Sequence, residues 1–144
     1  MKKDITAFLL LLALLFTKCE NTAPDTNKFT LREQSKLETI NALDLYNAYE
    51  GNAVNADDKF YRKYIIVSGA ILQIDKDEEN VFVSLDCGGV NEKIKCFMTN
   101  GSEVSKLKPN NIVSIKGVCL GKRHFIGNIL TDENYPTLIW CILK

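Results

Sequence analysis

The sequence predicts a mainly β fold, in which a five-stranded barrel is preceded by an N-terminal helix. Five segments from residue 64 onward combine apolar residues with β-branched character or strand-like alternation. Glycine interrupts two of them, at Gly69 and Gly117, and a glycine inside a strand commonly marks a bulge or a sharp bend. Helical periodicity is confined to the start and to one short connection. Short, bent strands of this kind favour a strongly coiled, OB-like barrel over a sandwich.

The helix is predicted from Asn41 to Gly51. Asparagine is a favoured N-cap residue, and glycine is typical of the position after the last helical turn. The apolar side chains between these two residues recur at the spacing of one helix face, at Ala42, Leu45, Tyr46 and Tyr49. A second, short helical turn is expected within residues 55–60.

The strands begin at Tyr64, where the apolar period changes from helix to strand. A charged turn is expected at residues 75–80, and Gly88-Gly89 breaks the next apolar run. A short helical connection is expected at residues 104–107, and residues 125–130 are a further candidate strand. In chain order, the five main strands are predicted at residues 64–74, 81–86, 94–98, 112–119 and 138–143.

Residues 1–18 are expected to be a lipoprotein signal peptide. Lys2 and Lys3 precede an apolar run over residues 7–16, which is the pattern of a secretory signal. That run is too short for a membrane span, because it rises only about 15 Å as a helix against a hydrocarbon core of roughly 30 Å. Cys19 follows, and its position resembles the lipobox of bacterial lipoproteins, in which this cysteine is diacylated. Cleavage without lipid and an uncleaved anchor are the alternatives.

The lipobox resemblance implies export and lipid attachment to a bacterial membrane in the cell envelope, with the outer membrane as the expected location. Residues 19–38 are mostly polar and are expected to form a tether. Residues 39–144 then form the OB-fold domain. A chain of this length buries a core without help from metal ions or disulfides.

The charge of the chain is unevenly distributed. The whole chain carries 18 basic and 18 acidic side chains, but 3 basic and 1 acidic side chains precede Cys19. The remaining 15 basic and 17 acidic side chains give a net charge of −2. Because nucleic-acid affinity depends largely on neutralising phosphates, this balance weighs against a nucleic-acid-binding protein.

Several runs across the expected domain are similar to a known family. They include residues 45–71, the run Cys96-Phe97-Met98, and residues 140–143. These runs resemble bacterial OB-fold lipoproteins of the tRNA_anti-like family over roughly residues 41–143. The most specific matching positions are Tyr49, Asn52, Ala56, Asp57, residues 67–69, residues 117–121 and Cys141. The resemblance implies a helix packed on a five-stranded barrel, but it implies little about activity, because fold kinship is not a site.

Four cysteines lie in the expected domain, and an oxidising envelope would permit disulfides. If the second hairpin turns between residues 91 and 92, Cys87 faces Cys96 on the inward side. Cys119 ends one strand and Cys141 lies in the last, and these strands are neighbours in an OB barrel. We therefore expect the pairs Cys87–Cys96 and Cys119–Cys141, and the family resemblance supports the second pair more. Four buried free thiols are the alternative, while the spacing disfavours a zinc site.

No catalytic, metal or cofactor site is expected. His124 is the only histidine, and the basic run around it, residues 122–125, is typical of a solvated turn. No HExxH, GxSxG, GxGxxG or phosphate-binding loop occurs in the chain. The acidic residues within 75–79 lack the spacing of an EF-hand loop, so a solvated turn is favoured over a calcium site. We therefore expect a protein that is not an enzyme.

A ligand face is predicted on the second and third strands, which bind ligands in OB folds. In the predicted register Phe82 and Phe97 point outward together with Lys95, and Phe97 faces Asp86. The expected function is a membrane-tethered binding module that holds a peptide, a glycan or an envelope protein on this face. Binding of single-stranded nucleic acid is the alternative that the fold suggests, and a structural envelope protein without a dedicated ligand is a third.

Overall fold

The computed structural model describes residues 30–126 and 129–144, with backbone alone for residues 123–126 and 129–132. The predicted signal peptide, Cys19 and residues 19–29 of the predicted tether lie outside the described residues. Among the helices that are described, none is long and apolar enough to cross a membrane. The elements are, in chain order, β1 (Glu38–Asn41), α2 (Ala42–Gly51), α3 (Ala53–Phe60), β2 (Tyr64–Lys76), β3 (Val81–Asp86), β4 (Lys93–Met98), the short 3₁₀ helix η2 (Gly101–Val104), β5 (Ile112–Ile126) and β6 (Ile129–Leu143).

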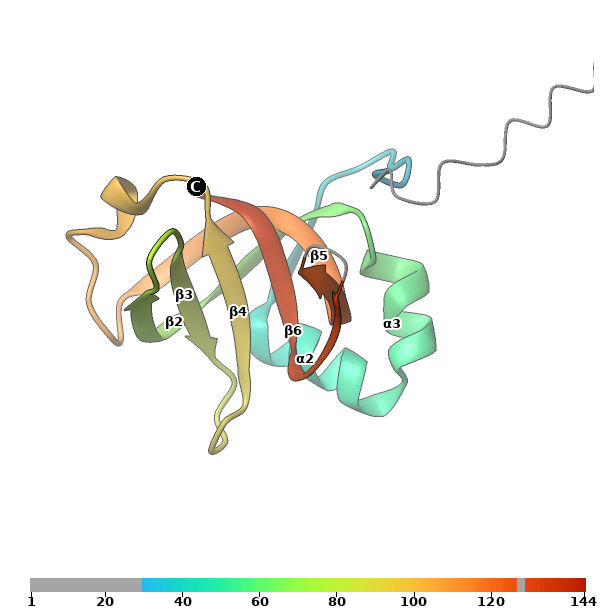
Figure 1. Cartoon of the computed structure of the whole chain (residues 1–144). Helices are drawn as coiled ribbons and strands as arrows, with labels where there is room; N and C mark the ends of the chain where they lie inside the picture. Colours follow the sequence, from blue (N-terminus) through green and yellow to red (C-terminus); the bar gives the residue numbers. More distant parts are fainter. Residues whose placement is uncertain (1–29, 127–128) are drawn as a thin grey trace, which may run out of the picture.

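Five strands close into a barrel, in the order β2, β3, β4, β6, β5 and back to β2 (Figure 1). The β4–β6 pair is parallel, and the other neighbours in the barrel are antiparallel. The first half of β2 pairs with β5 and its second half pairs with β3, so β2 takes part in both sides of the closure. The short β1 pairs in parallel with the first half of β2. The predicted five-stranded OB barrel, preceded by a helix, is confirmed.

Both helices precede the barrel strands and bury one face each. The Asn41 side chain accepts a hydrogen bond from the Leu43 backbone N–H at 2.9 Å, which confirms the predicted start of α2. The predicted second turn is a complete helix, α3, because the Asn52 side chain caps it and accepts from the Asn55 N–H at 3.1 Å. The buried helix side chains are Ala42, Leu45 and Tyr49 of α2 and Ala56 and Phe60 of α3.

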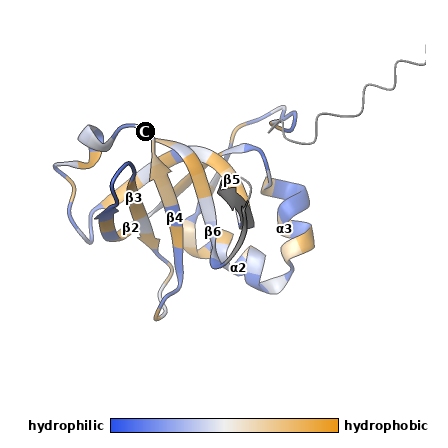
Figure 2. Ribbon diagram, in the orientation of Figure 1, coloured by the Kyte–Doolittle hydropathy of each residue, from blue (hydrophilic) through white to orange (hydrophobic). Residues whose placement is uncertain are grey.

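The barrel core follows from the alternation of side chains along the strands. Figure 2 shows hydrophobic and hydrophilic bands alternating along the front strands β4 and β6. Inward-facing residues such as Val83, Leu85, Ile94 and Cys96 are fully buried. Because successive strand residues point to opposite faces, Ser84 and Lys95 between them point away from the barrel core, although Ser84 is buried as well and Lys95 is half-buried.

Gly69 allows α2 to sit close against the barrel. A Cβ atom at this position would lie 2.9 Å from the Cβ of Ala42, closer than real Cβ atoms approach. The irregularity in β2 itself lies between Ile71 and Gln73, so the bend predicted at Gly69 is displaced along the strand. At Gly117 the predicted interruption is present, since the β5–β6 register shifts between Lys116 and Val118.

The last two strands are longer than predicted. β5 and β6 form one long hairpin that contains the described part of the candidate strand at residues 125–130, while residues 127–128 are outside the described residues. The segments between residues 120 and 137 are rich in charged and polar residues, which do not show the apolar alternation of a half-buried strand. Backbone pairing with a neighbouring strand extends them beyond the segments that the alternation marks.

The β3–β4 hairpin turns two residues earlier than predicted, midway between Cys87 and Glu92. The Cys87 backbone N–H donates to the Glu92 carbonyl at 3.1 Å. Gly88 and Asn91 take positive φ angles of 95° and 68°, and these residue types adopt that region most readily. The predicted register, with Cys87 opposite Cys96, is therefore wrong.

The close approach at Gly69 makes a direct prediction about stability. Gly69→Ala is expected to lower the free energy of unfolding by about 1–3 kcal/mol, because the added methyl group overpacks the α2–barrel contact. Gly51→Ala is the matched control, since a Cβ there meets no atom within 4 Å and alanine is the better helix former. Urea denaturation of both variants measures the effect, and equal stabilities would contradict the account of Gly69.

Candidate binding face

Phe82 and Phe97 face each other across β3 and β4. Their ring centroids are 5.6 Å apart and their planes are inclined by 45°, a favourable geometry for an aromatic pair. The prediction that Phe97 faces Asp86 is wrong, because the hairpin turns earlier along the chain. The adjacent Val83 and Cys96 are fully buried, so the two rings lie on the outer side of the barrel.

Lys95 lies over both rings. Its Nζ is 4.2 Å from the centroid of Phe82 and 5.0 Å from that of Phe97, which are cation–π distances. The structure thus brings together the three residues that the sequence singled out as a possible ligand face. We call Phe82, Lys95 and Phe97 the aromatic–lysine cluster.

The described helices do not lie across the aromatic–lysine cluster. α2 packs on the barrel through Ala42, Leu45 and Tyr49, which join the core. In Figure 1, β3 and β4 lie at the front of the view, with α2 behind them and α3 on the far side of β6. The half-burial of Phe82 and Phe97 is accounted for by their contact with each other and with Lys95. The cluster is accordingly on a solvent-facing part of the hairpin.

Two further lysine–aromatic pairs on the strands were missed from the sequence. The Nζ of Lys93 lies 4.8 Å from the Tyr135 ring centroid, next to the cluster on β4 and β6. The Nζ of Lys116 lies 4.9 Å from the Tyr64 ring centroid, on β5 and β2. These pairs could not be found from the sequence, because each lysine and its partner ring come from distant segments. The one available signal is the polar–apolar alternation around Lys93 and Lys95, which places both lysines on the same side of a strand.

In the acidic turn between β2 and β3, backbone N–H groups of the same turn bind the Asp77 carboxylate. The Asp77 carboxylate accepts from the backbone N–H of Asn80 at 2.7 Å and of Glu79 at 3.0 Å. These hydrogen bonds lower the pKa of Asp77, with a smaller contribution from the positive charge of Lys95. The turn therefore places negative charge near the cluster.

The residues that are most similar to the family lie elsewhere, where the helices meet β5. The Tyr49 hydroxyl is 3.4 Å from the Cys119 Sγ, and the Gly121 backbone N–H donates to the same sulfur at 3.5 Å. A Cβ at Gly121, which has φ of 64°, would lie 2.6 Å from Asp57 Oδ1. Burial is the main cause that raises the pKa of Tyr49. These contacts show that the motif residues attach the helices to the barrel.

The four cysteines of the domain are buried free thiols, so neither predicted disulfide is present. Cys96 lies opposite Val83 in the observed register, away from Cys87, whose Sγ donates to the Ala42 carbonyl at 3.5 Å. Cys119 pairs with Leu138 across the β5–β6 ladder, and not with Cys141. Burial raises the pKa of Cys87 to about 12 and that of Cys119 to about 11.

His124 lies in β5, opposite Thr131, and its side chain is outside the described part of the structure. The backbone at His124 is therefore extended, and the turn predicted there is wrong.

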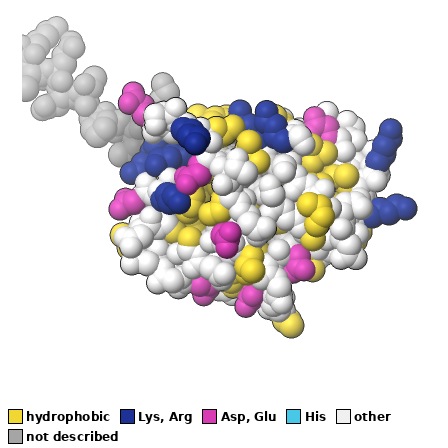
Figure 3. Space-filling model, turned by 180° about the vertical axis from the view of Figure 1, so that it is seen from behind, with side chains coloured by type: hydrophobic (Ala, Val, Ile, Leu, Met, Phe, Trp, Pro, Cys, Tyr) yellow, Lys and Arg dark blue, Asp and Glu magenta, His cyan; other side chains and the backbone are white. Residues whose placement is uncertain are grey.

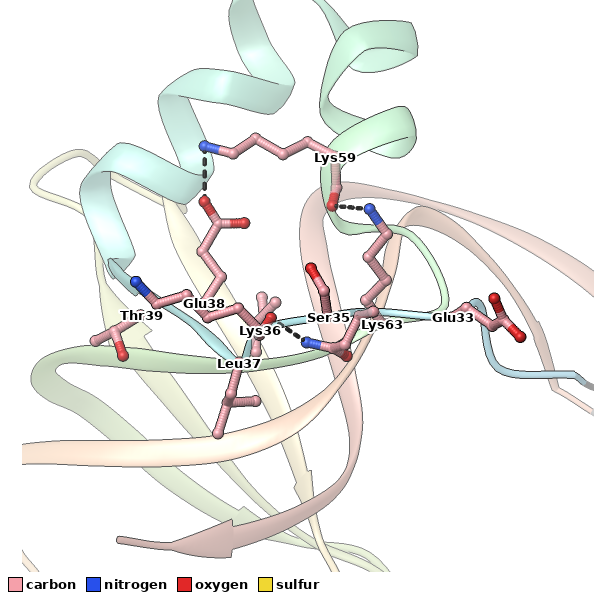
Figure 4. Close-up of a pocket in the computed structure, with 10 residues that line it drawn as sticks. Glu33, Ser35, Lys36, Leu37, Glu38, Thr39, Lys59 and Lys63 are labelled. Carbon is pink, nitrogen blue, oxygen red and sulfur yellow. Dashed lines mark hydrogen bonds and ion pairs between the residues drawn. The ribbon is translucent and has the colours of Figure 1, made fainter.

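A groove of about 670 Å³ separates residues 33–39 from α3 (Figure 4). Lys59 pairs with Glu38 at 2.9 Å, and Lys63 Nζ donates to the Lys59 carbonyl at 2.8 Å. The Gln34 side chain exchanges two hydrogen bonds of 2.8 Å with the Tyr64 backbone, so part of the predicted tether contacts the barrel. In Figure 3, which shows the molecule from behind, cationic and acidic side chains are intermixed on the left of the view. The lysines that line the groove thus have partners within the protein, a carboxylate for Lys59 and a carbonyl for Lys63.

Comparisons with known proteins agree with this architecture. The model of the family tRNA_anti-like matches residues 1–134. A crystal structure of a Klebsiella pneumoniae subsp. pneumoniae MGH 78578 protein, proposed to be a nucleic acid-binding lipoprotein, matches with a TM-score of 0.57 and 17% identity. The match covers 75% of this chain and 92% of that chain. The S. pombe Stn1-Ten1 complex matches with a TM-score of 0.36 and 18% identity, over 56% of this chain and 57% of that chain. The comparison with curated proteins finds no match.

The state of the thiols can be tested by alkylation. In the native protein at pH 8, iodoacetamide is expected to leave Cys87, Cys96, Cys119 and Cys141 unmodified, because all four side chains are buried. In urea without reductant, all four are expected to react, and the mass of the intact protein counts them. If any of the four reacts in urea only after reduction, a disulfide is present and the free-thiol account is wrong.

Proposed function

Because the chain belongs to the tRNA_anti-like family of OB-fold proteins, we propose that it is a non-catalytic binding protein of the bacterial cell envelope. Its ligand, a peptide, a glycan or another envelope protein, binds at the aromatic–lysine cluster. The observation that carries this proposal is the stacking of Lys95 over the paired rings of Phe82 and Phe97 on an outer face of the barrel. OB folds bind their ligands on this pair of strands.

The cluster suits a ligand that offers both flat apolar surface and polar groups. Phe82 and Phe97 present apolar ring surface, and the Lys95 ammonium supplies three hydrogen-bond donors beside them. Lys95 is held by cation–π contacts and forms no ion pair with another residue in the described part of the structure. Its charge is therefore available to a polar or anionic group of a ligand.

A lipid anchor on Cys19 forms part of the same proposal. Support comes from the position of Cys19 directly after the apolar run and from the likeness to the Klebsiella protein, itself proposed to be a lipoprotein. The lipid holds the domain at a membrane, and the chain that follows Cys19 leads to Arg32, which hydrogen-bonds to the carbonyls of Asp57 and Arg62.

Single-stranded nucleic-acid binding is the second candidate. The observation in its favour is the aromatic pair with an adjacent lysine, since bases stack on such rings and a cation pairs with phosphate. The nucleic-acid role proposed for the Klebsiella protein points in the same direction. The acidic turn at Asp77 and the net charge of −2 after residue 18 oppose it.

The binding face can be tested by photo-crosslinking in cells. Benzoylphenylalanine replaces Phe97 in one variant and Val90 in the control, because Val90 lies in the β3–β4 turn and is 93% exposed but off the cluster. A nuclease-resistant adduct from position 97 alone is the result that we expect. An adduct that nuclease degrades would support the nucleic-acid candidate instead. Absence of any adduct at position 97 would contradict both and favour a structural role.

The anchor can be tested separately with an alkyne-labelled fatty acid. The label is expected on the wild-type protein and on the control Cys87→Ala, and to be absent from Cys19→Ala. Persistence of the label in Cys19→Ala would show that Cys19 is not the lipidated residue. Gel mobility after click coupling to a fluorophore measures the outcome.

A further inference from the structure

Trp140 lies in a bulge beside the aromatic–lysine cluster. Cys96 pairs with Leu138 and Met98 with Cys141, so one residue of β4, Phe97, stands opposite two residues of β6, Ile139 and Trp140. Both flanking residues of β6, Leu138 and Cys141, are fully buried, whereas Trp140 is 49% exposed. The bulge thus places the tryptophan on the outer surface of the barrel, next to Phe97.

The backbone at Trp140 is unfavourable for its residue type. Its φ of 53° lies in the left-handed region, which bulky side chains rarely adopt and which glycine adopts freely. A strained residue persists when the surroundings enforce it, and such residues cluster at ligand sites. Here the left-handed backbone holds a large aromatic residue in the bulge opposite Phe97, where a glycine would relieve the strain without supplying a ring.

Phe82, Phe97 and Trp140 therefore occupy a row of positions across three neighbouring strands, β3, β4 and β6. With strands spaced by about 4.8 Å, the row spans about 10 Å from the first strand to the last. That length is comparable with two linked sugar rings, whose C–H faces stack on aromatic side chains. OB barrels use this face for oligosaccharides as well as for oligonucleotides.

The charge beside the row separates these two ligand classes. Two cations, Lys93 and Lys95, lie on β4, and carboxylates adjoin them: Asp86 is the cross-strand neighbour of Lys93, and Asp75 is that of Phe82. Burial, and after it Glu133, raises the pKa of Tyr135, the ring beneath Lys93, so a further carboxylate lies near these cations. A strand with a phosphate at every nucleotide would meet these carboxylates, whereas a ligand with an isolated negative charge would meet Lys95 alone.

We propose that the row of Phe82, Phe97 and Trp140 binds a glycan chain that carries isolated carboxylates. Lys95 moves from over Phe82 and Phe97 to pair with a carboxylate, and the sugars stack on the rings that it uncovers. This inference rests on the proposed function and specifies the ligand class of the same face.

Titration with defined oligosaccharides tests the proposal. The probes are neutral chitotetraose, a hyaluronan tetrasaccharide with a carboxylate on every second sugar, a densely sulfated heparin tetrasaccharide and the oligonucleotide dT8. Trp140 is the only tryptophan of the chain, so its fluorescence reports binding at the row directly. The hyaluronan tetrasaccharide is expected to bind about tenfold more tightly than chitotetraose, the ratio that one charge-assisted hydrogen bond supplies.

Variants separate the roles of the residues, with affinity measured by calorimetry. Lys95→Gln is expected to lower the hyaluronan affinity about tenfold, to the level of chitotetraose. Trp140→Gly is expected to abolish binding of both sugars, because it removes the ring while glycine adopts the backbone angle freely. Trp140→Phe keeps a ring and retains binding, and Val90→Ala is the control that changes neither affinity nor stability.

Several outcomes would overturn the inference. They are tighter binding of dT8 or heparin than of hyaluronan, no binding of either glycan, and full glycan affinity in Trp140→Gly. A crosslink from position 97 in cells without glycan binding in solution would reject the glycan and leave the proposed function intact. Glycan binding without that crosslink would reject the cellular role and keep the chemistry of the face.

Discussion

Backbone pairing between β2 and β5 turns an open sheet into a closed barrel, and the positions of the other elements depend on it. Seven residue pairs, from Tyr64 with Val118 to Ala70 with Ile112, form this seam. Closure divides every strand into an inner and an outer set of residues, because successive side chains alternate. Gly69 belongs to the seam, and its missing side chain lets α2 pack there. The same closure leaves the outer side of β3 and β4 turned toward solvent.

The structure separates the residues that hold the fold from those that offer a binding surface. Tyr49, Cys119 and Gly121, which resemble the family most, join the helices to β5. Phe82 and Phe97 contact each other and Lys95 on the outer side of the hairpin. Similarity to the family therefore indicates the fold, and the ligand has to be argued from the outer face of the barrel.

The sequence predicted the features that depend on local chemistry. The Asn41 cap, one buried helix face and five apolar strand segments each arise within a few residues, so one stretch of sequence contains the whole signal. The predicted register of the β3–β4 hairpin was wrong. The positive φ angles of this turn fall at two separate positions, Gly88 and Asn91. The sequence, which shows two adjacent glycines, does not indicate where the chain turns.

Features that depend on distant segments could not be predicted in this way. The Cys87–Cys96 disulfide was predicted from the hairpin register and failed with it, while Cys119–Cys141 was predicted from the adjacency of two strands, which does not bring these two residues opposite each other. Trp140 reaches the face only because a bulge in β6 meets β4, which lies some forty residues earlier in the chain. Its neighbours in sequence, Ile139 and Cys141, give no sign of a surface ring beside Phe97.

We expect the outer face of β3 and β4 to be occupied by a ligand in the cell. Hydroxyl-radical footprinting tests it most directly, by comparing the full-length protein in intact cells with the purified protein. If a ligand covers this face, Phe82 and Phe97 are less oxidised in cells than in the purified protein, while Val90 is oxidised equally in both. Equal oxidation of Phe82 and Phe97 in the two samples would contradict it.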